Sequence, residues 1–261
     1  MITEKLYKIS AKTMILMVFY LIGLGLRDAK DISLKGLEAA KGCNKLYLES
    51  YTSKMGCDKV ELEALFCKDI ALADRGLVEQ RMDELLLEAR TEDVALLVPG
   101  DPLSATTHIS LRNRARELGI VLQTIHNASI LTAVAETGLE LYKFGRTVSI
   151  PFENEDVASP YDALKKNLSL GLHTLFLLDL RPNEERYMSA TEALDYLFRQ
   201  GLLKEQFSIA CAALGTEKQE IIAGPAEKVR EHKLMQSPQC LIIPGDMHFV
   251  EEETVQRFLV G

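Results

Sequence analysis

The sequence offers little that would tie the protein to metals, nucleic acids or membranes. Its five cysteines are scattered and form no CxxC pair that could bind zinc or carry out dithiol chemistry. This cysteine usage favours a reducing, cytoplasmic location. The formal net charge is -8, and such a charge repels nucleic acid and anionic lipid alike. We therefore expect no metal site, no nucleic-acid partner and no membrane partner.

Long hydrophobic runs are also missing. The apolar run "MILMVFYLIGLGL" at 14–26 follows three lysines and imitates a signal peptide. It is shorter than the roughly 20 residues that cross a bilayer, it ends in glycines, and no small-x-small cleavage site follows it. We expect a buried first strand instead. Residues 1–13 are then an optional N-terminal extension, and Met1, Met14 and Met17 are alternative starts.

Several catalytic motifs are absent as well. There is no G-x-S-x-G elbow and no P-loop lysine motif, and chain order indicates no Ser-His-Asp constellation. The loop "GLGLRD" at 23–28 invites a dinucleotide interpretation, with Glu49 as the ribose-binding acid. However, Asp28 stands where the third glycine belongs, and a carboxylate there would repel a pyrophosphate. We favour a plain glycine turn over NAD binding.

What the sequence does contain is a series of short apolar runs. The 261 residues are 47% hydrophobic, which is enough for one large domain or two modest ones. Each run is a predicted strand. In the first half the runs cover residues 17–23, 45–49, 94–99, 121–125 and 147–150. In the second half they cover residues 174–180, 207–214, 219–224 and 240–245.

Helical patterns lie between these predicted strands. One covers 75–90, with its leucines on or near one face. Another lies between Ser189 and Gly201, with the capping-box spacing of Ser189 and Glu192 at its start and a glycine stop at its end. Strands that alternate with helices predict an α/β fold with a largely parallel sheet.

The stretch "FENEDVASPYD" at 152–162 interrupts this alternation. Its acids, its serine and Pro160 are typical of an interdomain linker or a long loop. We therefore predict two α/β domains, an N-terminal domain over residues 14–150 and a smaller C-terminal domain over residues 151–261.

The segment "VPGDPLSATTH" at 98–108 is the most specific of the loops. Pro99 and Pro102 fix φ, and Gly100 allows a sharp turn or a close approach to a ligand. Asp101 follows a predicted parallel strand, at the end where open α/β sheets bind ligands. An Asx-type turn, with Asp101 capping a helix from Ala105, explains the same residues equally well.

A third loop, "IHNASI" at 125–130, again follows a predicted strand, with Asn127 and Ser129 as candidate helix caps. Because the carboxyl ends of parallel strands meet at one edge, we expect the three loops to converge on one rim. His108 and His126 are by residue type more often structural hydrogen-bonding groups than catalysts.

Taken together, the motifs resemble the diphthine synthase family. "YLIGLGLRDAKDISLKGLEAAK", "ESYTS", "PGDPLSATTH", "IHNASI", "GLELYKFG", "NLSLGLHTLFLLDL" and "IIPGDMHFVEEE" occur in this family's order from about Met17 to the C-terminus. The family belongs to the class III, tetrapyrrole methylase-like methyltransferases. The resemblance implies two α/β domains, S-adenosyl-L-methionine in a cleft between them, and a homodimer.

The implied reaction is methylation of the amino group of a modified histidine on elongation factor 2, a step toward diphthamide. Archaeal members of the family form a trimethylammonium, and eukaryotic members also esterify the carboxylate; the residues do not decide between these products. A related methyltransferase acting on a tetrapyrrole or another small molecule is the alternative, and a nucleotide-binding regulatory protein is a third. No general base is assigned, because Asp101, His108, His126 or water could accept the proton.

The resemblance also implies a set of cofactor-binding residues, with Asp101 reaching the cofactor and Ser104 beside it. The full set is Leu26, Asp101, Ser104, Ser129, Ile130, Leu178, Leu214 and Gln239. Ala213 and Gln239 depart from the family pattern, which often has an arginine and a histidine at these positions. The resemblance therefore supports the C-terminal part of the site less strongly.

Overall fold

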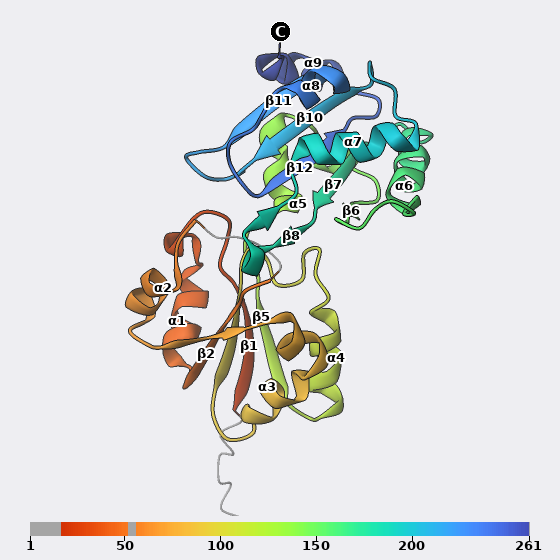
Figure 1. Ribbon diagram of the computed structural model, residues 1–261. Helices are drawn as coiled ribbons and strands as arrows, with labels where there is room; N and C mark the ends of the chain where they lie inside the picture. The colour runs from red at the N-terminus through yellow and green to blue at the C-terminus, as the bar shows by residue number, and fades with distance from the viewer. Residues whose placement is uncertain (1–16, 52–55, 261) are drawn as a thin grey trace, which may run out of the picture.

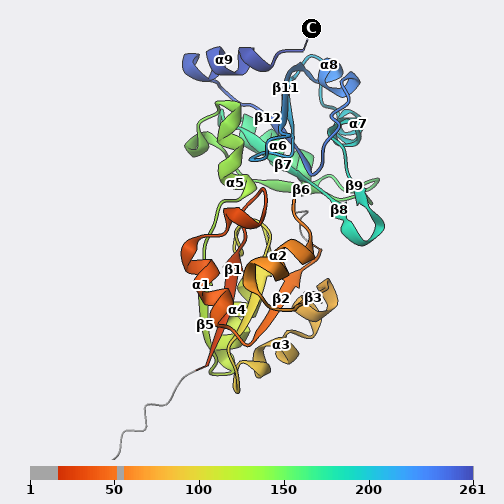
Figure 2. The same cartoon turned by 90° about the vertical axis from the view of Figure 1, so that its left-hand side faces the viewer.

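The described residues form two five-stranded β-sheets, one above the other and each covered by helices, and one small two-stranded sheet (Figures 1 and 2). The structure is a computed structural model and describes residues 17–51 and 56–260. The expectations for residues 1–13 and for the alternative starts at Met1 and Met14 lie outside the described residues. None of the helices in the described ranges combines the length and the apolar character that a bilayer-spanning helix needs.

The first sheet is entirely parallel, as the alternation of strands and helices predicts. Its strand order is β3-β2-β4-β1-β5. The strands are β1 (Val18–Gly23), β2 (Lys45–Glu49), β3 (Ile70–Ala73), β4 (Val94–Val98) and β5 (Val121–Ile125). The helices are α1 (Leu34–Gly42), α2 (Lys59–Phe66), α3 (Met82–Glu88) and α4 (Ile109–Glu117), with the 3-10 turn η1 (Ala29–Asp31) and the π-helical turn η2 (Gly76–Gln80).

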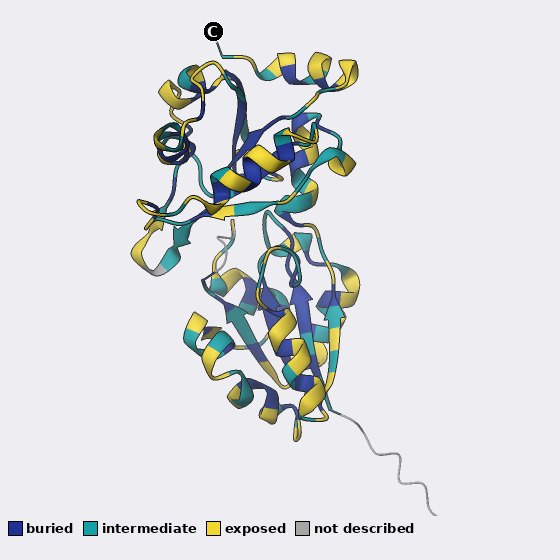
Figure 3. Ribbon diagram, turned by 90° about the vertical axis from the view of Figure 1, so that its right-hand side faces the viewer, coloured by how far each residue is buried: buried dark blue, intermediate teal, exposed yellow. Residues whose placement is uncertain are grey.

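Both faces of the first sheet are buried. Successive side chains of a strand point to opposite faces, so Leu21 packs in the core beneath α3 and α4, whereas Ile22 packs beneath α1 and α2. All five residues of β4 are buried. Figure 3 shows the buried strands between helices whose outer faces are exposed. This two-sided burial explains the continuous apolar runs in the sequence.

The second sheet is mixed rather than largely parallel. Its order is β11-β10-β12-β7-β6, and only β6 and β7 are parallel. These strands are β6 (Val148–Ile150), β7 (Thr174–Leu178), β10 (Phe207–Ala212), β11 (Glu220–Pro225) and β12 (Gln239–Ile243), with the small pair β8 (Leu180–Arg181) and β9 (Arg186–Tyr187). The helices are α5 (Ile130–Ala133), α6 (Ser159–Leu168), α7 (Ala190–Gln200), α8 (Ala226–Glu231) and α9 (Phe249–Val255). The 3-10 turns are η3 (Val134–Thr137), η4 (Leu141–Lys143), η5 (Pro182–Glu184) and η6 (Gln256–Phe258).

The change from one sheet to the other comes earlier in the chain than the sequence predicts. β6 was expected at the end of the domain over 14–150, but it pairs with β7 in the second sheet. Val134 and Leu139 already pack in the core of that sheet. The change therefore falls after β5, and the expected boundary at residue 150 lies inside the second unit. The expected loop over 152–162 also ends early, because α6 begins at Ser159.

Two helical predictions had different outcomes. The predicted helix from Ser189 to Gly201 is confirmed as α7, with a complete capping box between Ser189 and Glu192 and a left-handed glycine at its end. The predicted helix over 75–90 is divided instead. Arg81 has a φ of -115° and separates the π-helical turn η2 from α3.

Candidate cofactor cleft

One cavity of about 570 Å³ lies between the two sheets. Loops that follow β1, β4 and β5 line it from the first sheet, and residues of β7, β10 and β12 line it from the second. Its size falls within the range of small-molecule and cofactor sites. All eight residues that the family resemblance predicts line this cavity, namely Leu26, Asp101, Ser104, Ser129, Ile130, Leu178, Leu214 and Gln239.

The three loops of the first sheet converge on one rim, as expected. Gly25 and Gly100 form an antiparallel bridge, with hydrogen bonds of 3.2 and 2.8 Å between their backbones. Both have positive φ values, 85° and 77°, which glycine adopts without strain. The side chain of Asn127 donates to the carbonyls of Gly23 and Asp31, both at 3.0 Å. The first loop is thus hydrogen-bonded to each of the other two.

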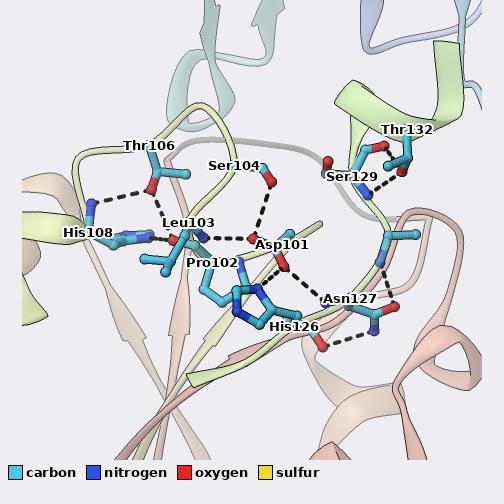
Figure 4. Close-up of polar contacts among 12 residues, drawn as sticks. Asp101, Pro102, Leu103, Ser104, Thr106, His108, His126, Asn127, Ser129 and Thr132 are labelled. Carbon is cyan, nitrogen blue, oxygen red and sulfur yellow. Dashed lines mark hydrogen bonds and ion pairs between the residues drawn. The ribbon is translucent and has the colours of Figure 1, made fainter. Parts of the chain in front are cut away.

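Asp101 is at the centre of this network (Figure 4). Its Oδ1 accepts from the Leu103 amide at 2.9 Å and from the Ser104 hydroxyl at 3.2 Å. Its Oδ2 accepts from His126 Nδ1 at 2.7 Å and from the Asn127 amide at 3.1 Å. The bond to Leu103 is the Asx-type turn, but it caps no helix at Ala105, because α4 begins at Ile109.

The electrostatics of Asp101 follow from these bonds. Burial alone would raise the pKa of its carboxyl, but the amides of Leu103 and Asn127 and the side chain of His126 outweigh burial and lower that pKa. The carboxylate is therefore ionised at neutral pH. Each oxygen of the Asp101 carboxylate already accepts two hydrogen bonds, so Asp101 can accept from a ligand only if one of these donors turns away. The same hydrogen bonds fix the loop that carries Ser104.

The two candidate histidines have different environments. His126 is exposed and donates Nδ1–H to Asp101, whereas His108 is buried and its Nδ1 lies 2.9 Å from the carbonyl oxygen of Pro102. Neither histidine is among the residues that line the cavity. The geometry therefore assigns neither as a general base.

The first loop is not arranged as a dinucleotide-binding loop. The amides of Leu26 and Arg27, which would face a phosphate, donate instead to Asp31 Oδ2 at 3.2 and 2.7 Å. Glu49 is buried beside His108 and does not line the cavity. The plain glycine turn is the better description of this loop.

On the side of the cavity formed by the second sheet, the structure agrees less fully with the expected set of cofactor-binding residues. Gln239 lines the cavity, but its side chain accepts from the Ala190 amide at 2.8 Å and donates to the Gln236 carbonyl at 2.9 Å. The side-chain amide of Gln239 therefore caps the start of α7 by a hydrogen bond. Ala105 and Ala213 face the cavity with φ values of 57° and 48°, a left-handed conformation that is uncommon for alanine.

The cavity is also lined by charged and polar residues outside the expected cofactor-binding set. Arg27, Asp28 and Thr106 belong to the motifs of the first two loops, but they were not expected to bind the cofactor. Thr216, Glu217 and Lys218 follow β10 and belong to no recognised motif, so no signal in the sequence pointed to them.

The resulting lining combines leucine and isoleucine side chains with three carboxylates, Asp28, Asp101 and Glu217, and with two cations, Arg27 and Lys218. Such a lining suits a ligand with an apolar body and charged groups of both signs. Among the described residues, no group of three or more His, Cys, Asp or Glu side chains could hold a metal ion.

A family model described as Tetrapyrrole (Corrin/Porphyrin) Methylases matches residues 18–230. The two α/β units and the cleft between them are therefore those of a methyltransferase. A crystal structure entitled "Crystal structure of diphthine synthase" superposes with a TM-score of 0.88 at 32% identity, covering 93% of this chain and 96% of that chain.

Two curated relatives narrow the assignment. The diphthine methyl ester synthase of Schizosaccharomyces pombe is 43% identical over 269 residues, which cover 94% of this chain and 95% of the relative. The enzyme of the same name from Homo sapiens is 40% identical over 272 residues, with 93% and 95% covered. The chain therefore belongs to the diphthine synthase branch of the tetrapyrrole methylase family.

Proposed function

We propose that the protein binds S-adenosyl-L-methionine in the cleft and methylates the amino group of the aminocarboxypropyl-modified histidine of elongation factor 2, forming diphthine. The observation that carries the proposal is the meeting of all eight expected cofactor residues around one cavity. The names of the curated relatives support one more methyl transfer, to the carboxylate, which yields the methyl ester.

The side chains that line the cavity fit this cofactor. Leu26, Ile130 and Leu178 would offer apolar surface to the adenosine, and the carboxylates of Asp101 and Glu217 would supply negative charge to the cationic groups of the cofactor. Ser104 and Ser129 supply hydroxyl groups at the rim. When bound, S-adenosyl-L-methionine supplies an activated methyl group with a good leaving group.

The contribution of the protein is then mainly alignment. Methyl transfer is an in-line displacement, so a cleft that fixes donor and amine in line supplies a large part of the acceleration. The three hydrogen-bonded loops hold Asp101 and Ser104 in fixed positions for this purpose. The acceptor ammonium must lose a proton before it reacts, and the open cleft lets water take it. Repeated methylation also favours an open cleft.

We also propose that the protein acts in the cytoplasm as a homodimer. All five cysteines are free thiols, and three of them are buried, which fits a reducing compartment. Sedimentation over a range of protein concentrations tests the dimer, and a monomer at every concentration would contradict it.

The deciding experiment is a mass spectrum of elongation factor 2 that carries the aminocarboxypropyl-histidine, after incubation with the protein and S-adenosyl-L-methionine. We expect mass increases of one or more methyl groups on that residue. Elongation factor 2 without the modification is the control and should not change.

Two other results would favour the alternatives. Methylation of a tetrapyrrole, with none on elongation factor 2, would indicate a small-molecule methyltransferase of the same fold. Binding of S-adenosyl-L-methionine without turnover on any acceptor would indicate a regulatory protein.

A further inference from the structure

A second cavity, of about 410 Å³, adjoins the cofactor cavity. Ala105, from the loop after β4, and Leu177, from β7, line both cavities. The second cavity lies along β6, the edge strand of the second sheet, on the side of that unit that faces the first unit (Figures 1 and 2). A ligand in one cavity can therefore approach a ligand in the other across the boundary that the two cavities share.

Arg146 is the only charged residue among the described residues that line the second cavity. Its side chain forms no ion pair and no hydrogen bond within the described part of the chain. An unpaired guanidinium in a cavity wall that lacks carboxylates attracts an anion, and its planar fork of donors matches a carboxylate in particular. The second cavity is therefore suited to a ligand that carries a carboxylate.

The backbone at Arg146 is held in place by a buried side chain. Asn167 of α6, which is only 5% exposed, accepts from the Arg146 amide at 3.1 Å and donates to the Arg146 carbonyl oxygen at 3.0 Å. A Cβ at Gly145 would overlap Oδ1 of Asn167, so the close approach of the two segments requires glycine. The motifs "GLELYKFG" and "NLSLGLHTLFLLDL" thus meet where they fix the backbone of Arg146, while its guanidinium stays available to a ligand.

The rest of the second cavity is polar and open to the surface. Thr147, Ser149 and Ser159 bring hydroxyl groups to its wall, and these hydroxyls form no hydrogen bond with residues 17–51 or 56–260. Arg146, Ser149 and Ser159 are exposed, so a side chain that projects from another protein can enter. Ser149 is paired in register with Leu177, so this polar wall lies directly beside the boundary with the cofactor cavity.

The cofactor does not need Arg146. Arg146 does not line the cofactor cavity, which has its own cations, Arg27 and Lys218, for the carboxylate of S-adenosyl-L-methionine. The proposed reaction involves a second carboxylate, because the aminocarboxypropyl group of the acceptor carries one in addition to its amine. A cation beside the cofactor cavity, but outside it, is therefore placed for the acceptor.

We propose that the second cavity is the acceptor site, and that Arg146 binds the carboxylate of the aminocarboxypropyl group and so turns the amine toward the boundary at Ala105 and Leu177. Arg146 is then a substrate-binding residue that selects acceptors with both an amine and a carboxylate. The inference rests on the proposed function, since it takes modified elongation factor 2 as the acceptor. The contact belongs to the methylations of the amine, because the carboxylate must leave Arg146 and face the methyl group when the ester is formed.

The first test measures methylation of elongation factor 2 that carries the aminocarboxypropyl-histidine, at saturating S-adenosyl-L-methionine. Arg146→Gln removes the charge that binds the carboxylate, so the KM for the factor should rise about 10- to 100-fold. Arg146→Lys keeps the charge but loses the planar fork, so its KM should lie between those of the wild type and Arg146→Gln. Arg116→Gln changes an exposed arginine on α4 that lines neither cavity, and this matched control should leave KM unchanged.

Two further measurements separate substrate binding from a structural role. Calorimetry should give the same affinity for S-adenosyl-L-methionine in Arg146→Gln as in the wild type, and thermal unfolding should also be unchanged, because the guanidinium contacts neither the cofactor cavity nor a described partner. The second measurement compares kcat/KM for a synthetic peptide with the modified histidine and for the same peptide with that carboxylate converted to an amide. The wild type should prefer the carboxylate peptide about 10- to 100-fold, and Arg146→Gln should methylate both equally poorly.

Each contrary result has a definite meaning. An unchanged KM in Arg146→Gln, or an equal preference for the carboxylate peptide in both proteins, would overturn the role of Arg146 and leave the proposed function intact. Weaker cofactor binding in Arg146→Gln would assign the arginine to the cofactor and would overturn the acceptor site as well. If the wild type methylates neither the factor nor the peptides, the proposed function itself fails, and the acceptor site fails with it.

Discussion

Glu251 accepts a hydrogen bond of 2.9 Å from Nε2 of His173, with both side chains fully buried in the second unit. The same carboxylate accepts from the amides of Glu140 and His248 at 2.9 and 2.7 Å, and it forms an ion pair with Lys143. The His173 Nδ1 accepts from the Gly245 amide. His173 of "GLHTLFLLDL" and Glu251 of "IIPGDMHFVEEE" therefore meet in a structural cluster, and neither residue lines the cavity.

The first prediction concerns acid stability. Burial alone would raise the pKa of Glu251, but its hydrogen bonds and the ion pair lower it to about 2. Because this pKa lies below the ordinary value of 4.5, the stabilisation is fully present above about pH 4.5 and is lost as the pH falls toward 2. Glu251→Gln should lower the free energy of unfolding at pH 7 by about 3 kcal/mol.

Urea unfolding between acidic and neutral pH measures this prediction. Glu251→Gln should also depend less on pH in the acid range than the wild type. Glu136→Gln, an exposed carboxylate on η3, is the control and should change stability little. An unchanged acid profile in Glu251→Gln would show that Glu251 is not the group responsible.

The second prediction concerns Asp101. Asp101→Ala removes the acceptor that organises Leu103, Ser104 and Asn127, so S-adenosyl-L-methionine should bind more weakly by about 1.5 to 3 kcal/mol while the protein remains folded. Calorimetry measures the affinity, and circular dichroism checks the fold. Unchanged affinity would remove Asp101 from the cofactor site.

The third prediction uses two glycines as a matched pair. A Cβ on Gly23 would lie 2.6 Å from the Gly100 carbonyl oxygen and 2.8 Å from Cβ of Asn127, so Gly23→Ala must push the three loops apart. We expect a loss of about 1–3 kcal/mol in stability, together with weaker cofactor binding. At Gly42 a Cβ meets nothing within 4 Å, so Gly42→Ala should be neutral or slightly stabilising. Equal effects of the two substitutions would refute the close approach.

The fourth prediction concerns the start of the chain. A protein that begins at Met17 retains all of β1 and should fold and bind S-adenosyl-L-methionine like the full chain. Removal through Gly23 deletes a strand that lies between β4 and β5, so the first sheet should not form. Solubility and calorimetry measure both outcomes. Folding without β1 would contradict the sheet order.

The sequence predicts most strands because apolar runs and turn residues are local signals. It misses β3, an edge strand of four residues. Buried and exposed positions do not alternate in this strand, because its two end residues are buried and its two central residues are exposed. It also misplaces β6, because no local signal tells which of two sheets a three-residue strand will join.

The candidate site shows the same division between local and long-range information. Convergence of the three loops follows from the rule that parallel strands present their carboxyl ends at one edge, so it could be predicted. The contact between Glu49 and His108 joins positions far apart in the chain, and so does the hydrogen bond that the Gln239 side chain accepts from the Ala190 amide at the start of α7. No spacing in the sequence encodes either contact.

The described chain passes from the first sheet to the second through residues 126–129. This short connection both links the two units and contacts the candidate site. His126 and the Asn127 amide bond to Asp101, and Ser129 lines the cavity. A rotation that widened the angle between the two units would have to bend this connection, because the described chain passes between the units here. Such a rotation would pull on the donors that hold Asp101, so an opening of the cleft and a loosening of the loop that carries Asp101 would be one coupled motion.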